Sequence, residues 1–234
     1  MKTVAIHQPQ YLPWTPYFDK ILRSNAFIIL DNVQFQKNGL QNRNQIKTPQ
    51  GKTWLTLPVK HSFGQEINDV EIIDHVKQKH LRSIQMNYSR SPFFNEVYDI
   101  ISQTLNRNST SLSSISIDII HSILSYLEYE GEIHQASEFR INSSGSDLIL
   151  ELCKKLKAEQ YLSGIGGKNY LNKSTFDNAG IRIVFQRFNL PEYRQNFNKI
   201  GFLSDLSILD LLFNEGKRAI EIIKLGARSH KDWD

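Results

Sequence analysis

Thr3-Val-Ala-Ile-His-Gln-Pro-Gln-Tyr-Leu-Pro-Trp-Thr-Pro-Tyr-Phe-Asp-Lys20 is the stretch that decides the fold. Its apolar run at residues 4–6 predicts a short strand that leads directly into His7. Three aromatic residues, Tyr11, Trp14 and Tyr17, and three prolines follow closely. Because prolines restrict the backbone, a strand that ends in a histidine and a rigid aromatic loop can hold a reactive or ligand-binding group in place.

Alternating strands and helices extend outward from this segment. Residues 27–30 form a continuous apolar run that ends at Asp31, and such runs are typical of strands buried on both faces of a parallel sheet. Further strands are predicted at 70–73, 133–137, 161–162 and 181–186, and helices at 17–24 and 147–157. This order predicts an α/β fold, with a Rossmann-like, mostly parallel sheet flanked by helices.

A β-hairpin and a helical insertion interrupt the alternation. Residues 42–47 and 52–59 are extended runs separated by the turn Thr48-Pro-Gln-Gly51, which predicts the hairpin. Apolar residues recur at three- and four-residue spacing in three predicted helices, at 76–89, 93–106 and 112–129. We therefore expect a helical lobe, at about 76–130, inserted into the sheet domain.

The remainder of the chain completes one domain. A late helix is expected from near Ser204 to Gly216, a natural C-cap, and another to about Leu225. We expect a single α/β domain over residues 1–226 and a flexible tail over 227–234, which is polar apart from one tryptophan.

Composition limits the classes of partner. The 234 residues are 40% hydrophobic and 22% charged, which is enough for a sizeable core. The net charge of +4 is spread out and favours small anionic ligands, whereas a nucleic-acid surface would need clustered cations. The lone Cys153 excludes an internal disulfide and lies at the spacing of a buried helix face. No signal peptide or membrane span is visible, so we expect a cytoplasmic protein that does not insert into membranes.

The strand ends are the first candidate site. In open α/β sheets ligands bind at the carboxyl ends of strands, where both His7 and Asp31 are expected. The imidazole could act as a general base with the carboxylate orienting it, while Tyr11, Trp14 and Tyr17 stack on a base or sugar. The alternative is a histidine held by the prolines, with Asp31 in a strand-end turn.

Other candidate ligand contacts lie further along the chain. Lys37 and Arg43 could bind phosphate or carboxylate groups, or belong to a solvated hairpin. The backbone of the glycine-rich run could form an anion nest or an ordinary tight turn; its candidate residues are Ser163, Gly164, Gly166, Gly167 and Tyr170. Asp210 is a carboxylate in an apolar helical run, so it is either structurally paired or part of the site. The histidines and the single cysteine show no spacing that predicts a metal site.

Several motifs follow one another along nearly the whole chain: Ile6-His-Gln-Pro-Gln-Tyr-Leu-Pro-Trp14, Tyr17-Phe18, 31–37, Asn42-Arg-Asn44, Trp54-Leu-Thr-Leu-Pro-Val59, Tyr161-Leu-Ser-Gly164 and Leu206-Ser-Ile-Leu-Asp-Leu-Leu-Phe-Asn-Glu-Gly216. Together these motifs resemble the WbqC-like family of bacterial proteins. The resemblance implies one continuous domain in a bacterial cytoplasmic protein. The family takes its name from surface-polysaccharide (O-antigen) gene clusters, which implies a link to nucleotide-sugar modification. Relatives tend to carry Trp in the segment 37–42, where this chain has Leu40.

Three hypotheses follow for the activity. The first is a transferase that moves an acyl or aminoacyl group to a nucleotide-linked amino sugar, with His7 as general base, Asp31 orienting it, and Gln8 among the substrate contacts. The second is a nucleotidyltransferase-like enzyme. The third is a non-catalytic sugar- or nucleotide-binding accessory protein, because aromatic and amide-rich loops also suit carbohydrate binding. The residues identify no cofactor; the first hypothesis requires only an acyl or aminoacyl donor.

Overall fold

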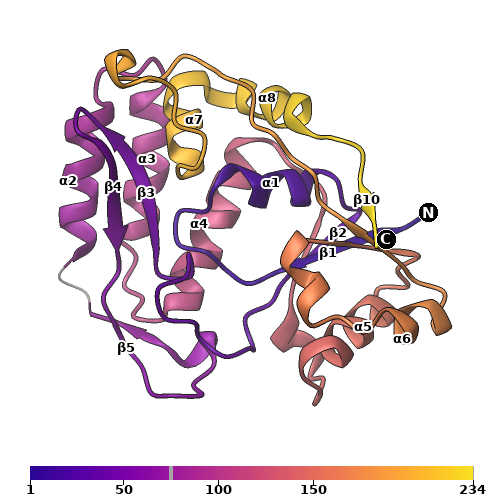
Figure 1. Cartoon of the computed structure of the whole chain (residues 1–234). Helices are drawn as coiled ribbons and strands as arrows, with labels where there is room; N and C mark the ends of the chain where they lie inside the picture. The colour runs from indigo at the N-terminus through magenta and orange to yellow at the C-terminus, as the bar shows by residue number, and fades with distance from the viewer. Residues whose placement is uncertain (74–75, 234) are drawn as a thin grey trace.

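A six-stranded sheet forms the centre of the computed structural model, which describes residues 1–73 and 76–233 (Figure 1). Its strands, in chain order, are β1 (Thr3–His7), β2 (Ala26–Ile29), β7 (Glu132–Gln135), β8 (Gln160–Ser163), β9 (Arg182–Phe185) and β10 (Lys231–Asp232). They lie in the order β10-β9-β8-β1-β2-β7, with all neighbours parallel except β10, which pairs antiparallel with β9. Numbered in chain order, this is the 3-2-1-4-5-6 arrangement of Rossmann sheets, so the predicted fold class is confirmed.

Helices cover both faces of the sheet. Because successive side chains of a strand point to opposite faces, neighbouring residues are buried in different apolar clusters. Val4 and Ile6 pack in one apolar cluster with α5 (Gly145–Lys155) and α6 (Lys173–Asn178). Ala5 packs in the other cluster, where the sheet meets α1 (Thr15–Leu22) and α8 (Ala219–Gly226). This two-sided burial explains the continuous apolar runs of β1 and β2. Cys153 is fully buried on α5, as its spacing predicted.

The predicted hairpin and helical insertion occupy the chain between β2 and β7. The hairpin consists of β3 (Arg43–Thr48) and β4 (Gly51–Thr56). A separate, smaller antiparallel pair is formed by β5 (Val59–Lys60) and β6 (Glu71–Ile72). The helices are α2 (Lys77–Tyr88), α3 (Phe94–Leu105) and α4 (Leu112–Tyr126), close to their predicted ranges. A late helix, α7 (Ile208–Glu215), returns to contact α3 and β3, and Figure 1 shows these elements gathered beside the sheet.

The C-terminal third shows two differences from the sequence-based expectations. The helix expected from near Ser204 begins later, because the hydroxyl of Ser207 accepts a hydrogen bond from the Leu209 amide and caps α7. The segment expected to be a flexible tail contains β10, and Arg182 pairs with Asp232 across that edge. Asp234, the last residue of the expected tail, lies outside the described residues.

Candidate functional site

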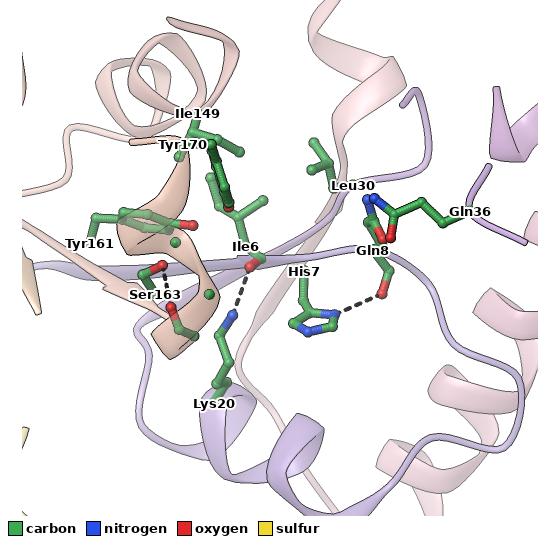
Figure 2. Close-up of a pocket in the computed structure, with 13 residues that line it drawn as sticks. Ile6, His7, Gln8, Lys20, Leu30, Gln36, Ile149, Tyr161, Ser163 and Tyr170 are labelled. Atoms are coloured by element: carbon green, nitrogen blue, oxygen red, sulfur yellow. Dashed lines mark hydrogen bonds between the residues drawn. The ribbon is translucent and has the colours of Figure 1, made fainter. Parts of the chain in front are cut away.

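A crevice opens at the carboxyl ends of β1 and β8, where the chain order of the sheet reverses. This reversal is the place where open α/β sheets bind ligands, because helices cover opposite faces on its two sides. The cavity measures about 350 Å³ and is shown in Figure 2. Its lining residues are Ile6, His7, Gln8, Lys20, Leu30, Gln36, Ile149, Tyr161, Ser163, Gly164, Gly166, Gly167 and Tyr170.

Two segments predicted from sequence as ligand contacts meet in this crevice. One is the end of β1, with His7 and Gln8; the other is the glycine-rich run, with Ser163, its glycines and Tyr170. Parallel neighbours β1 and β8 bring them together, since Ala5 pairs with Leu162 just before both strands end. Sequence reasoning missed three polar lining residues, Lys20, Gln36 and Tyr161.

His7 is held as a neutral imidazole at the end of β1. Its Nδ1 lies 3.1 Å from the carbonyl oxygen of Gln8, and because a carbonyl only accepts, Nδ1 carries the proton. The Nε2 atom is therefore left as a hydrogen-bond acceptor. Burial, together with the nearby Lys20 charge, lowers the pKa of His7 to about 3. The ring also meets Tyr17 edge-on, with centroids 5.1 Å apart.

Lys20 is a buried amine on α1 whose side chain is only 2% exposed. Its Nζ donates a 2.8 Å hydrogen bond to the carbonyl oxygen of Ile6 (Figure 2). Burial lowers the pKa of Lys20 to about 7, against a smaller raising effect of the Asp19 carboxylate. The amine is therefore divided between its charged and neutral forms near neutral pH. The available sequence signal was its place three residues after Tyr17, on the buried face of the helix.

The glycine-rich run turns tightly after β8. Ser163 donates through Oγ to the Gly164 carbonyl at 3.0 Å, and the chain then forms a 3-10 turn over Ile165–Asn169. A Cβ on Gly167 would lie 2.1 Å from Ser163 Oγ, so a larger residue there would force the Ser163 side chain to move. By contrast, a Cβ on Gly164 or Gly166 would meet nothing within 4 Å, which leaves this backbone open to an approaching ligand.

Amide groups line the opposite side of the crevice. The side chain of Gln41 holds them from behind. Its Nε2 donates to Oε1 of Gln8 at 2.7 Å, and its Oε1 accepts from the backbone N–H of Gln36 at 2.8 Å. The side-chain amide nitrogen of Gln8 stays available as a donor. Tyr170 is 53% exposed and hydrogen-bonds with Tyr161, which is itself buried. The crevice therefore offers amides, hydroxyls and one amine, and none of its lining residues is acidic.

Comparison with known proteins places this chain in a family. A model of the WbqC-like protein family matches residues 8–222. The chain belongs to the WbqC-like family. It is 34% identical over 230 residues to uncharacterized protein Rv1507c of Mycobacterium tuberculosis, covering 96% of this chain and 98% of that protein. The resemblance based on the quoted motifs is thereby confirmed.

Asp31 of this WbqC-like chain has a structural partner. Its two carboxylate oxygens accept hydrogen bonds from the Ser137 amide, at 2.9 Å, and from the Ser137 hydroxyl, at 2.6 Å. Asp31 thereby fixes the turn after β7, and it is not among the residues that line the crevice. Tyr11 is similarly engaged, with its hydroxyl 2.8 Å from Nδ1 of the buried His80.

The remaining predicted contacts also lie outside the crevice lining of the WbqC-like chain. Lys37 is exposed, and Arg43 stacks over Trp54 at 4.4 Å while donating to the Asn38 carbonyl at 2.5 Å. Asp210 is fully buried and accepts 2.8 Å hydrogen bonds from the hydroxyls of two tyrosines, Tyr88 and Tyr193. Burial raises the pKa of Asp210, and both tyrosines counter that effect.

Two further features concern metals and membranes. Within residues 1–73 and 76–233, no group of three or more His, Cys, Asp or Glu side chains is placed to hold a metal ion. No helix in the same described ranges combines the length and apolarity that crossing a bilayer demands.

Proposed function

We propose that this WbqC-like protein is a bacterial cytoplasmic transferase that transfers an acyl or aminoacyl group to the amine of a nucleotide-linked amino sugar in surface-polysaccharide biosynthesis. The observation that carries the proposal is the crevice at the carboxyl ends of β1 and β8, with its polar lining at the sheet's reversal point. The link to polysaccharide synthesis comes from the family's gene-cluster association.

The crevice chemistry suits such a substrate. The amides of Gln8 and Gln36 and the hydroxyl of Tyr170 can hydrogen-bond sugar hydroxyls. The open backbone at Gly164 and Gly166 allows a phosphate to approach closely. A cavity of about 350 Å³ is within the range that holds one small molecule.

His7 fits an orienting role in this reaction better than that of a strong base. With a pKa of about 3, its neutral ring can accept a hydrogen bond from the substrate amine at Nε2, but it holds a proton weakly at pH 7. Asp31 accepts hydrogen bonds from Ser137, whereas the Nδ1 of His7 is oriented by the Gln8 carbonyl. The proton released by the attacking amine therefore needs another acceptor.

The test is a mass-spectrometric assay of the purified protein. UDP- and dTDP-linked amino sugars are each incubated with acyl-CoA thioesters or with aminoacyl-tRNA esters. The expected product is the amino sugar with the added mass of the acyl or aminoacyl group. A His7→Ala variant should lose at least tenfold in rate, whereas His121→Ala, which alters an exposed histidine on α4, should match the wild type. Binding of a nucleotide sugar without turnover of any donor would instead favour the accessory-protein hypothesis.

A further inference from the structure

A second pocket adjoins the crevice. It measures about 380 Å³ and is lined by His7, Trp14, Pro16, Lys20, Gly164, Ile165, Gly166, Gln186 and Phe188. Four of these residues, His7, Lys20, Gly164 and Gly166, also line the crevice. The two cavities therefore lie side by side and share one wall, made by the end of β1, α1 and the glycine-rich run.

The two cavities differ in chemistry. The residues that belong only to the second pocket are mainly apolar, with Trp14 and Phe188 as aromatic walls. Its one amide, Gln186, is already engaged: Nε2 donates to the Pro16 carbonyl at 2.8 Å and to an Asp19 carboxylate oxygen at 2.6 Å. The residues found only in the crevice include the amides and tyrosine hydroxyls. An apolar group fits the second pocket, and a polar sugar fits the crevice.

Lys20 is the titratable amine on the shared wall. Figure 2 shows its Nζ between Ser163 and the His7 ring, directed at the Ile6 carbonyl oxygen. Building on the proposed function, we infer that the second pocket binds the acyl part of the donor, the crevice binds the amino sugar, and Lys20 accepts the proton at their junction. Trp14, a predicted ligand contact absent from the crevice, thereby becomes a contact of the donor.

In the inferred step, the amine of the sugar displaces the thiol or alcohol of the donor. The amine nitrogen of the sugar attacks the carbonyl carbon of a thioester or ester donor, so a C–N bond forms and the C–S or C–O bond breaks. The lone pair of neutral Lys20 Nζ takes the proton released by the amine. The departing thiolate or alkoxide then receives that proton, and Lys20 returns to its neutral form. His7 accepts a hydrogen bond from the attacking amine and orients it.

The accessibility of Lys20 is tested on the wild-type protein without any substrate. The native protein is treated briefly with acetic anhydride between pH 5.5 and 9, and the acetylated peptides are quantified by mass spectrometry. We expect Lys20 to react, at a rate that is half-maximal near pH 7 because the neutral amine is the nucleophile. If Lys20 stays unmodified at pH 9 while the exposed Lys224 reacts fully, the amine faces neither cavity and the inference is wrong.

The catalytic role is tested with the donor and sugar pair that gives product in the transfer assay. Lys20→Met and Lys20→Arg should both lower kcat at least 100-fold, with either KM changed less than threefold. Arginine retains the charge but cannot accept the proton, so its failure to rescue distinguishes proton transfer from charge alone. The wild-type kcat should fall as the pH drops below about 7. A Lys20→Met enzyme with wild-type kcat would overturn the role while leaving the proposed function intact.

A matched pair of variants tests the two subsites. Trp14→Ala should raise the KM of the donor about tenfold and leave that of the amino sugar within twofold. Tyr170→Ala, on the crevice side, should have the opposite pattern. If both variants raise the KM of the same substrate, the cavities are not separate subsites. Absence of product with every pair would instead contradict the proposed function itself.

Discussion

Replacing Lys20 with methionine should stabilise the protein near neutral pH, although it removes an inferred catalytic amine. Lowering the pKa of the lysine from 10.5 to about 7 on folding corresponds to about 5 kcal/mol of lost stability. Methionine has a similar length and carries no charge, so it avoids that cost. It also gives up the hydrogen bond to Ile6, worth about 2 kcal/mol when the donor is charged. The expected net gain is about 2 to 3 kcal/mol at pH 6.5.

The sign of the pH dependence follows from proton binding. Between the folded pKa of about 7 and the unfolded value of 10.5, the unfolded chain holds the Lys20 proton and the folded chain has lost it. Wild-type stability therefore rises with pH through this window, relative to the methionine variant. The advantage of Lys20→Met should be largest at or below pH 7 and should shrink by about 3 kcal/mol at pH 9.5.

Urea unfolding followed by circular dichroism at pH 6.5 and 9.5 measures both effects. The control is Lys224→Met, an exposed lysine on α8, which should change stability by less than about 0.5 kcal/mol. A methionine variant that is less stable than the wild type at pH 6.5 would refute the reasoning. So would an advantage that stays constant between the two pH values.

Three further substitutions test the structural assignments. Asp31→Ala removes both hydrogen-bond acceptors of Ser137, so the free energy of unfolding in urea should fall by about 2 kcal/mol while kcat/KM changes little. A loss of activity without a loss of stability would show that Asp31 belongs to the active site. Asp210→Ala leaves two buried tyrosine hydroxyls without their acceptor and should cost about 3 kcal/mol, so an unchanged Tm would contradict that pairing. Gly167→Ala should lower both Tm and kcat/KM, because its Cβ would lie 2.1 Å from Ser163 Oγ; normal values for both would show that the turn relaxes.

The sheet was predictable because its signals are local. Val4 to Ile6 and the run after Ala26 are apolar without alternation, and in the structure both runs are buried on both faces. Strands and helices that alternate along the chain leave few arrangements other than a parallel sheet. Helix starts were less predictable, since both Ser204 and Ser207 precede α7 and Ser207 is the residue that caps it.

The site was predictable only as far as strand ends determine it. His7 and Gly164 meet because parallel neighbours end at the same edge. Asp31 also follows a strand, but sequence does not reveal that the Ser137 turn reaches its carboxylate first. Lys20 was missed because lysines are mostly exposed, and its place three residues after Tyr17 is a weak signal beside that tendency.

The insertion takes part in the site by fixing the loop that connects β1 to α1. Leu12 in that loop has a φ of 47°, an unfavourable backbone conformation for a branched side chain, and the Nδ2 of Asn44 on β3 donates to its carbonyl at 2.8 Å. The Tyr11 hydroxyl is held at 2.8 Å by His80 on α2. Because this loop leads into α1, the hairpin and α2 together set where Trp14 and Lys20 lie. Asn44 of the hairpin therefore bears on the inferred subsites through the backbone of this loop, although it does not line the crevice.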